Sequence, residues 1–212
     1  MTAVRVALLG AESTGKTTLA HGMAGSLRAQ GFTVAVVDEV LREWCAREGR
    51  TPRPGEQLPI AQEQERRVDA AAHDAQVVIT DTTAVMVAIY SAMLFADGTL
   101  YRFALDRQRG YDLTLVTGLD VPWVADGLQR DGPHVREPVD ALVREALDQA
   151  GATYRVVYGS GDDRLRNALT PVLQLLGRAP TGDPSAANWT WACDKCSDPD
   201  CEHRLFRRLL AR

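Results

Sequence analysis

The stretch that decides the fold is Gly10-Ala11-Glu12-Ser13-Thr14-Gly15-Lys16-Thr17. An apolar run, Val4–Leu9, comes directly before it, and a helical pattern begins at Lys16. The two glycines permit a tight loop whose backbone N–H groups point inward, and the following helix directs its positive dipole end at the same place. The spacing therefore predicts a phosphate-binding loop (P-loop) between a buried strand and a helix.

Residues of this loop have separate predicted tasks. Lys16 would place a positive charge on the β and γ phosphates of a nucleoside triphosphate, and Thr17 would offer its hydroxyl to Mg²⁺. ATP and Mg²⁺ are therefore the expected cofactors. The residues expected to bind the nucleotide are Gly10, Glu12, Ser13, Thr14, Gly15, Lys16, Thr17 and Thr18.

Short β-branched runs alternate with longer helical patterns along the rest of the chain. Strands are predicted at 4–9, 33–37, 77–79, 113–116 and 155–158. Such alternation is typical of βαβ units, so we expect an α/β fold of the P-loop NTPase class, with a mainly parallel five-stranded sheet flanked by helices.

The composition changes near residue 177. The segment that follows is rich in Gly, Pro, Ala and Ser, as a linker would be. We predict a P-loop NTPase domain at 1–176, a linker at 177–187 and a separate tail at 188–212.

Charge and hydropathy exclude several classes of protein. The 212 residues carry a formal net charge of −4, which argues against a dedicated nucleic-acid or membrane-surface binder. No apolar stretch approaches the length of about 18 residues that a transmembrane helix needs. The N-terminal apolar run is too short for a signal peptide, and clustered cysteines fit a reducing compartment, so we expect a cytoplasmic protein.

Acidic residues follow two of the predicted strands. Ligands of open α/β sheets bind beyond the carboxyl ends of the strands. Asp81 follows the third strand, where it could hold Mg²⁺ together with Thr17. Asp38 and Glu39 follow the second strand, where a carboxylate could accept a hydrogen bond from a substrate hydroxyl or deprotonate it. The same positions suit helix N-caps without a catalytic role, so both interpretations stay open.

Two further features supply positive charge near these carboxylates. Arg42 lies three residues after Glu39 on the same helix face, where it forms either a surface ion pair or a contact with an anionic or hydroxylated substrate. The segment 122–136 mixes turn formers with Trp123 and Arg130, as expected of a loop that closes over phosphates and excludes water. The alternative is an ordinary solvent-exposed loop.

Four motifs follow one another in a recognisable order: G-A-E-S-T-G-K-T-T-L at 10–19, E-V-L-R-E at 39–43, D-T-T at 81–83, and Y-D-L-T-L…D-V-P-W-V-A-D-G-L at 111–128. In these motifs the chain resembles the NadR-type ribosylnicotinamide kinase family, which belongs to a group of small P-loop proteins often labelled AAA-family ATPases. The resemblance covers about residues 1–176, and the D-x-P-W-V-x-D-G-L element is more specific than the phosphate loop.

The resemblance implies a P-loop kinase core with a lid, and ATP-dependent phosphorylation of a nucleoside 5′-hydroxyl such as that of nicotinamide riboside. The family's functional residues map to Glu39, Arg42 and Asp81, and its lid arginines to Arg130 and, second, Arg136. The candidate catalytic residues are thus Lys16, Glu39, Arg42, Asp81 and Arg130. The candidate residues for the small-molecule acceptor are Asp38, Glu39, Arg42 and Trp123.

Two positions depart from the family pattern. Asp38 stands where the kinases carry an aromatic residue suited to stacking on the nicotinamide ring, and Thr83 replaces a second carboxylate. Neither change touches ATP binding, but both leave the acceptor open. A regulatory P-loop ATPase that binds a protein partner through its tail is the alternative interpretation, and a non-catalytic adaptor is a third.

The tail contains three cysteines and a histidine in the pattern C-x₂-C-x₄-C-x-H. Three thiolates and an imidazole complete a tetrahedral ligand set for structural Zn²⁺, so we predict a zinc-knuckle-like tail held by Cys193, Cys196, Cys201 and His203. Free thiols packed on the core and a redox dithiol are the alternatives. The basic helix predicted after the cysteines leaves a protein partner or a homo-oligomer open.

Overall fold

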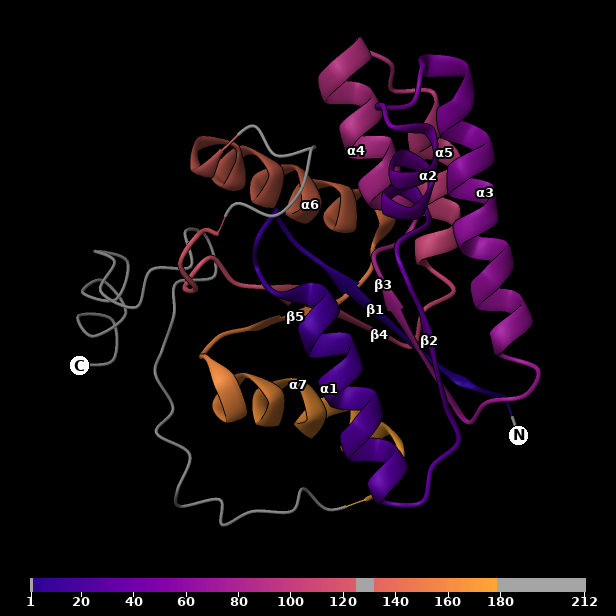
Figure 1. Cartoon of the computed structure of the whole chain (residues 1–212). Helices are drawn as coiled ribbons and strands as arrows, with labels where there is room; N and C mark the ends of the chain where they lie inside the picture. The colour runs from indigo at the N-terminus through magenta and orange to yellow at the C-terminus, as the bar shows by residue number, and fades with distance from the viewer. Residues whose placement is uncertain (1, 125–131, 179–212) are drawn as a thin grey trace.

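A five-stranded sheet forms the centre of the molecule (Figure 1). The computed structural model describes residues 2–124 and 132–178. The strands are β1 (Val4–Leu9), β2 (Val34–Val37), β3 (Val77–Asp81), β4 (Leu113–Thr117) and β5 (Tyr154–Val157). They lie in the order β2-β3-β1-β4-β5 and every neighbouring pair is parallel, which confirms the predicted α/β fold.

Helices connect the strands as the predicted βαβ units require. They are α1 (Lys16–Ala29), α2 (Val40–Glu48), α3 (Pro54–Ala71), α4 (Ala84–Phe95), α5 (Leu100–Gln108), α6 (Arg136–Ala150) and α7 (Gly161–Leu175), with a short 3₁₀ turn at Pro133–Val135. The helix α3 begins at Pro54. Proline is tolerated in the first turn of a helix, and the Glu56 carboxylate accepts the Arg53 N–H at 2.7 Å.

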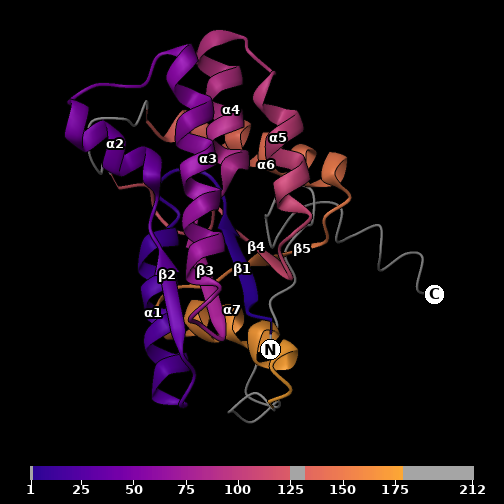
Figure 2. The same ribbon diagram turned by 90° about the vertical axis from the view of Figure 1, so that its right-hand side faces the viewer.

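The helices cover the two faces of the sheet unequally. In Figures 1 and 2, α1 and α7 pack side by side on one face, while α2 to α6 lie beyond the other. Alternation along β1 fits both layers: Val6 and Leu8 join the core beneath α1 and α7, and Leu9 joins the core on the opposite face.

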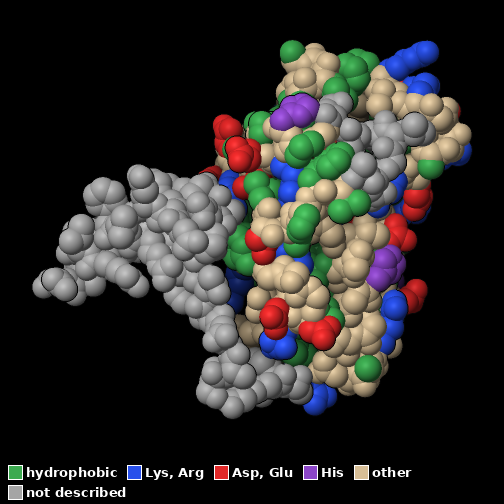
Figure 3. All heavy atoms as spheres, turned by 60° about the vertical axis from the view of Figure 1, so that its left-hand side comes forward, with side chains coloured by type: hydrophobic (Ala, Val, Ile, Leu, Met, Phe, Trp, Pro, Cys, Tyr) green, Lys and Arg blue, Asp and Glu red, His purple; other side chains and the backbone are tan. Residues whose placement is uncertain are grey.

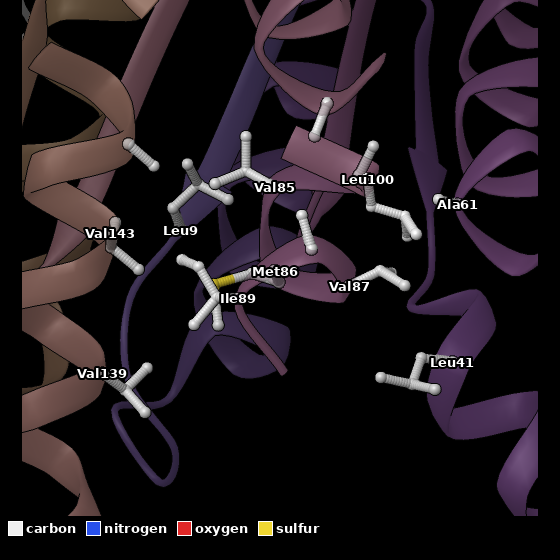
Figure 4. Packing of buried hydrophobic residues seen from close by; sticks show 14 of the residues in the cluster. Leu9, Leu41, Ala61, Val85, Met86, Val87, Ile89, Leu100, Val139 and Val143 are labelled. Carbon is white, nitrogen blue, oxygen red and sulfur yellow. The ribbon is translucent and has the colours of Figure 1, made fainter. Parts of the chain in front are cut away.

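The larger core is centred on α4, whose side chains are apolar nearly all round. Figure 4 shows Val85, Met86 and Ile89 of this helix among side chains from β1, α2, α5 and α6. A helix that is apolar on all sides must be covered on all sides, and α3, α5 and α6, together with core residues of β1, β4 and α2, do this for the first half of α4. The N-terminus of α4 is thereby held at the carboxyl end of β3.

Acidic and basic side chains are intermixed on the face in Figure 3. Within the described ranges, no helix has the length and apolar character needed to cross a membrane. Arg130, nearly all of the predicted linker and the proposed zinc ligands Cys193, Cys196, Cys201 and His203 lie outside those ranges.

Candidate functional site

The loop after β1 adopts the tight path that its glycines predict. Gly10 has a φ of 138°, and a Cβ atom there would lie 2.2 Å from Thr117 Oγ1 of β4. Gly15 has a φ of 77°. Ser13 is also left-handed, with a φ of 54°, which costs a non-glycine residue free energy. Close approach of β4 thus explains the first glycine, and backbone conformation explains the second.

Lys16 bends back across this loop. Its Nζ donates to the Gly10 carbonyl at 2.9 Å and the Ala11 carbonyl at 2.8 Å, and only 8% of the residue is exposed. Thr14 is buried completely, and its Oγ1 lies 2.6 Å from Thr117 Oγ1. The Lys16 ammonium is therefore held at the loop, and the Thr14 side chain links the loop to β4 through Thr117.

Asp81 lies beside the start of α1 because β1 and β3 are neighbours. The register pairs Leu8 with Asp81, and the Thr17 hydroxyl donates a hydrogen bond to Asp81 Oδ2. Asp81 is 1% exposed, and its other oxygen, Oδ1, has no hydrogen-bond partner within the described residues. A hydroxyl and a buried carboxylate with a spare oxygen are ligands that suit Mg²⁺, so the residues present fit the predicted metal.

A guanidinium connects this pair to the end of β2. Arg42 Nη1 donates to Thr17 Oγ1 at 3.1 Å, and Arg42 Nη2 lies 3.1 Å from Glu39 Oε2. The Glu39 side chain is largely buried, whereas that of Arg42 is about half exposed. Glu39, Arg42, Thr17 and Asp81 therefore form one continuous polar chain across the carboxyl ends of β2, β1 and β3.

A cleft of about 900 Å³ opens beside the phosphate loop. Its wall consists of the loop and the first half of α1, Arg42 of α2, the segment 121–124 after β4, and the start of α7. The lining residues are Ser13, Thr14, Gly15, Lys16, Thr17, Thr18, Leu19, Gly22, Arg42, Val121, Pro122, Val124, Ser160, Gly161, Arg164 and Leu165. A volume of this size accommodates a nucleotide.

Some predicted site residues lie outside the cleft lining. Asp38 pairs with His21, with 3.2 Å between Oδ1 and Nε2, and both side chains are about half exposed. Glu12 is half-buried in the phosphate loop. Trp123 is half-buried, and its indole Nε1 has no hydrogen-bond partner within the described part of the chain. Glu39 and Asp81 also lie outside the lining. The binding and catalytic roles of all the predicted site residues stay predictions.

The segment after β4 is tied to the phosphate loop. Ser13 Oγ donates to the Val124 carbonyl at 2.9 Å and accepts the Val124 N–H at 2.8 Å. Arg136 is buried and donates to the Val121 carbonyl at 2.9 Å and the Leu119 carbonyl at 3.3 Å. Burial and the nearby positive charge of Arg164 lower the pKa of Arg136. In this structure Arg136 therefore braces the segment and does not line the cleft.

Arg164 is a component of the site that the sequence did not reveal. Its Nη2 donates to the Thr14 carbonyl at 3.0 Å and the Gly118 carbonyl at 3.2 Å, and Nη1 lies 3.0 Å from Asp120 Oδ1 and 2.9 Å from the Gly159 carbonyl. One buried guanidinium thus fixes the loops after β1, β4 and β5. No motif surrounds Arg164, and only the pairing with Asp120 of the D-V-P-W element could have drawn attention to it.

Arg164→Met should destabilise the protein by about 3 kcal/mol, because it removes the donor to Asp120 Oδ1 and to three backbone carbonyl groups. The nucleotide should also bind about tenfold more weakly, since the loop is held less firmly. Chemical denaturation and titration with an ATP analogue measure the two effects. Arg166→Met is the matched control: Arg166 is exposed on the same helix, and its only ion pair within the described residues is with Asp163. Equal effects of both substitutions would contradict the bracing role.

Thr83, the position that departs from the kinase pattern, has a structural task. Its buried Oγ1 accepts the Val85 N–H at 3.2 Å and donates to Gln108 Oε1 at 2.8 Å. It therefore caps α4 and bridges to α5. The second carboxylate of the resembled family is replaced here by a helix cap.

The fold and this site define a P-loop nucleotide-binding protein. Residues 5–164 match the family model described as the AAA domain, and the chain belongs to that family. No curated protein matches the chain in sequence.

Solved structures that share the fold include two of the NadR protein. One is the NadR protein in complex with NR, with a TM-score of 0.68 and 18% sequence identity, covering 86% of this chain and 52% of that chain. The other is the NadR protein in complex with NAD and AMP-PNP, with a TM-score of 0.62 and 19% identity, covering 82% and 49%. The chain spans about half the length of these NadR chains. The predicted resemblance to the NadR-type P-loop kinases is thereby confirmed in fold.

Proposed function

We propose that the chain is an ATP-dependent kinase that transfers the γ-phosphate to a hydroxyl of a nucleoside such as nicotinamide riboside. The observation that carries this proposal is the Arg42 guanidinium, which bridges the Thr17 hydroxyl and the Glu39 carboxylate at 3.1 Å each. A carboxylate so near the phosphate loop can accept the proton of an attacking hydroxyl. The NadR structures with NR and with AMP-PNP support a nucleotide donor and a nucleoside-type acceptor.

On the donor side, the cleft would hold ATP with its phosphates against the loop. Lys16 would contact the β and γ phosphates, and Thr17 and Asp81 would hold Mg²⁺. The metal, when bound, would neutralise charge on the phosphate oxygens. Because Arg42 now contacts Thr17, it would move toward the transferred group or the acceptor when the metal occupies that hydroxyl.

On the acceptor side, Glu39 would orient the nucleoside hydroxyl and take its proton as the oxygen bonds to phosphorus. The bond between the γ-phosphorus and its bridging oxygen breaks, and ADP leaves. Arg42 and Arg130 would stabilise the equatorial oxygens, and Asp38 and Trp123 would contact the nucleoside. Thr83 supplies no second carboxylate, so hydroxyl activation would depend on Glu39.

Glu39→Gln is expected to lower kcat for nucleoside phosphorylation by about 10²-fold, because the amide cannot accept the proton. Binding of an ATP analogue should change little. ADP formation, measured with and without a panel of nucleosides that includes nicotinamide riboside, gives the rate. Glu43→Gln is the control, since Glu43 lies on the same helix and pairs with Arg67 at 2.7 Å, away from the cleft.

Two outcomes would count against the proposal. Undiminished phosphorylation by the Glu39→Gln variant, with Lys16→Ala inactive, would remove Glu39 from the role of base. ADP formation that no nucleoside stimulates would favour the regulatory ATPase instead.

A further inference from the structure

Gln64 is a buried side chain of α3 that contacts two of the elements carrying the candidate active site. It is 1% exposed and does not line the cleft. Its Oε1 accepts the Val40 N–H at 2.9 Å, and its Nε2 donates to Thr80 Oγ1 at 3.0 Å. Val40 follows Glu39 directly, and Thr80 directly precedes Asp81. A single amide group thus links the backbone next to Glu39 to β3, the strand that ends in Asp81.

The contact with Val40 replaces a helix cap. The first N–H groups of a helix have no partner within the helix, and the side chain of the N-cap residue usually accepts one of them. Glu39 is the N-cap of α2, but its side chain makes no capping hydrogen bond and pairs instead with Arg42. Because Gln64 accepts an N–H of that first turn, the Glu39 carboxylate is available to the site.

The contact with Thr80 continues to the far side of Asp81. Thr80 Oγ1 accepts from Gln64 and donates to the Thr82 carbonyl at 2.6 Å. Thr82 is held in a left-handed conformation, with a φ of 74°. Only one orientation of the Gln64 amide offers an acceptor to Val40 and a donor to Thr80. The hydrogen bonds therefore have a defined direction and fix the backbone on both sides of Asp81.

We propose that Gln64 is a positioning residue that sets the Glu39 carboxylate relative to Asp81. This inference rests on the proposed kinase function, in which Glu39 serves the acceptor and Asp81 the metal. Gln64 acts through these two residues and contacts no substrate.

The test compares Gln64→Met with Gln57→Met. Methionine fills nearly the same volume without an amide. Gln57 is equally buried on α3, seven residues earlier, and in the described part of the chain its amide makes only a 3.4 Å contact with the Pro52 carbonyl. Gln64→Met should lower kcat about tenfold with KM for ATP within about twofold, and should raise the Mg²⁺ concentration for half-maximal binding of a non-hydrolysable ATP analogue several-fold. Exchange of the Val40 amide should accelerate in the ligand-free protein.

The positioning role would be overturned if Gln64→Met and Gln57→Met changed kcat and the Mg²⁺ dependence by the same amounts. It would also be overturned if Gln64→Met left both the Mg²⁺ dependence and the exchange of the Val40 amide unchanged. The kinetic effect should also shrink in a Glu39→Gln background, because both changes act on one group. A wild-type protein that phosphorylates no nucleoside would refute the proposed function alone, since metal-dependent binding and amide exchange still report on Gln64. If Gln64→Met does not fold, Gln64→Glu is the second variant. Its ionised carboxylate, present at high pH, keeps the acceptor for Val40 but has no donor for Thr80. It should therefore change the Mg²⁺ dependence and leave Val40 exchange near the wild-type rate.

Discussion

Lys16→Met is expected to lower ATP-dependent activity by about 10³-fold, because it removes the positive charge held at the phosphate loop. The Lys16 ammonium contacts two loop carbonyls and is almost fully buried, so its position is defined before any ligand arrives. Methionine keeps most of the aliphatic stem and its packing. The loss should therefore appear chiefly in nucleotide turnover. The two loop carbonyls lose a donor, so a smaller change is expected in the unfolding transition, which a melting curve measures separately.

Lys16→Arg sharpens this prediction. The chain strongly prefers arginine, and of its 24 basic residues only Lys16 and Lys195 are lysines. A guanidinium is wider and planar, and cannot occupy a buried position between the Gly10 and Ala11 carbonyls in the way that a compact ammonium does. We therefore expect Lys16→Arg to lose at least about 10²-fold in rate. Activity close to wild type in Lys16→Arg would mean that charge alone suffices there.

Asp81→Asn is the second change with a large expected effect. The amide keeps the size of the side chain and can still accept from Thr17, but it removes the negative charge that a divalent cation needs. The Mg²⁺ concentration for half-maximal activity should rise at least about tenfold, and kcat at saturating metal should fall about 10²-fold. Rates measured across a Mg²⁺ titration provide both values.

Asp112→Asn is the control for that substitution. Asp112 precedes β4 at the opposite end of the sheet, where its carboxylate accepts the Arg5 N–H at 2.8 Å. Metal dependence should be unchanged in this variant. If Asp81→Asn showed an unchanged Mg²⁺ dependence as well, Asp81 would be a structural partner of Thr17 and not a metal ligand.

The sequence was sufficient to predict the sheet and the phosphate loop, because both depend on local patterns. The signals for the phosphate loop lie within one short stretch of sequence: the apolar run Val4–Leu9, the two spaced glycines and Lys16. The ends of elements were less predictable. β3 was expected at 77–79 but continues to Asp81, because Thr80 and Asp81 are polar and yet lie between neighbouring strands in the centre of the sheet. Their partners, Gln64 and Thr17, are remote in sequence.

Residues that brace the site were missed for the same reason. Arg164 and Gln64 carry no motif, and their importance depends on which backbone groups the completed fold brings to them. Thr83 shows the converse. Its sequence position indicated a lost carboxylate, but only the structure identifies it as the cap of α4 and the partner of Gln108.

The Arg164 clamp has a consequence for how the protein is made. The guanidinium and the Thr14 carbonyl that it holds are separated by 150 positions in the chain. During translation, the phosphate loop leaves the ribosome long before its brace has been synthesised. Long-range contacts of this kind form slowly. The nascent chain therefore carries an incomplete nucleotide site until α7 has emerged, and before that point a nucleotide would bind the loop more weakly and stabilise the domain less than it would in the finished fold.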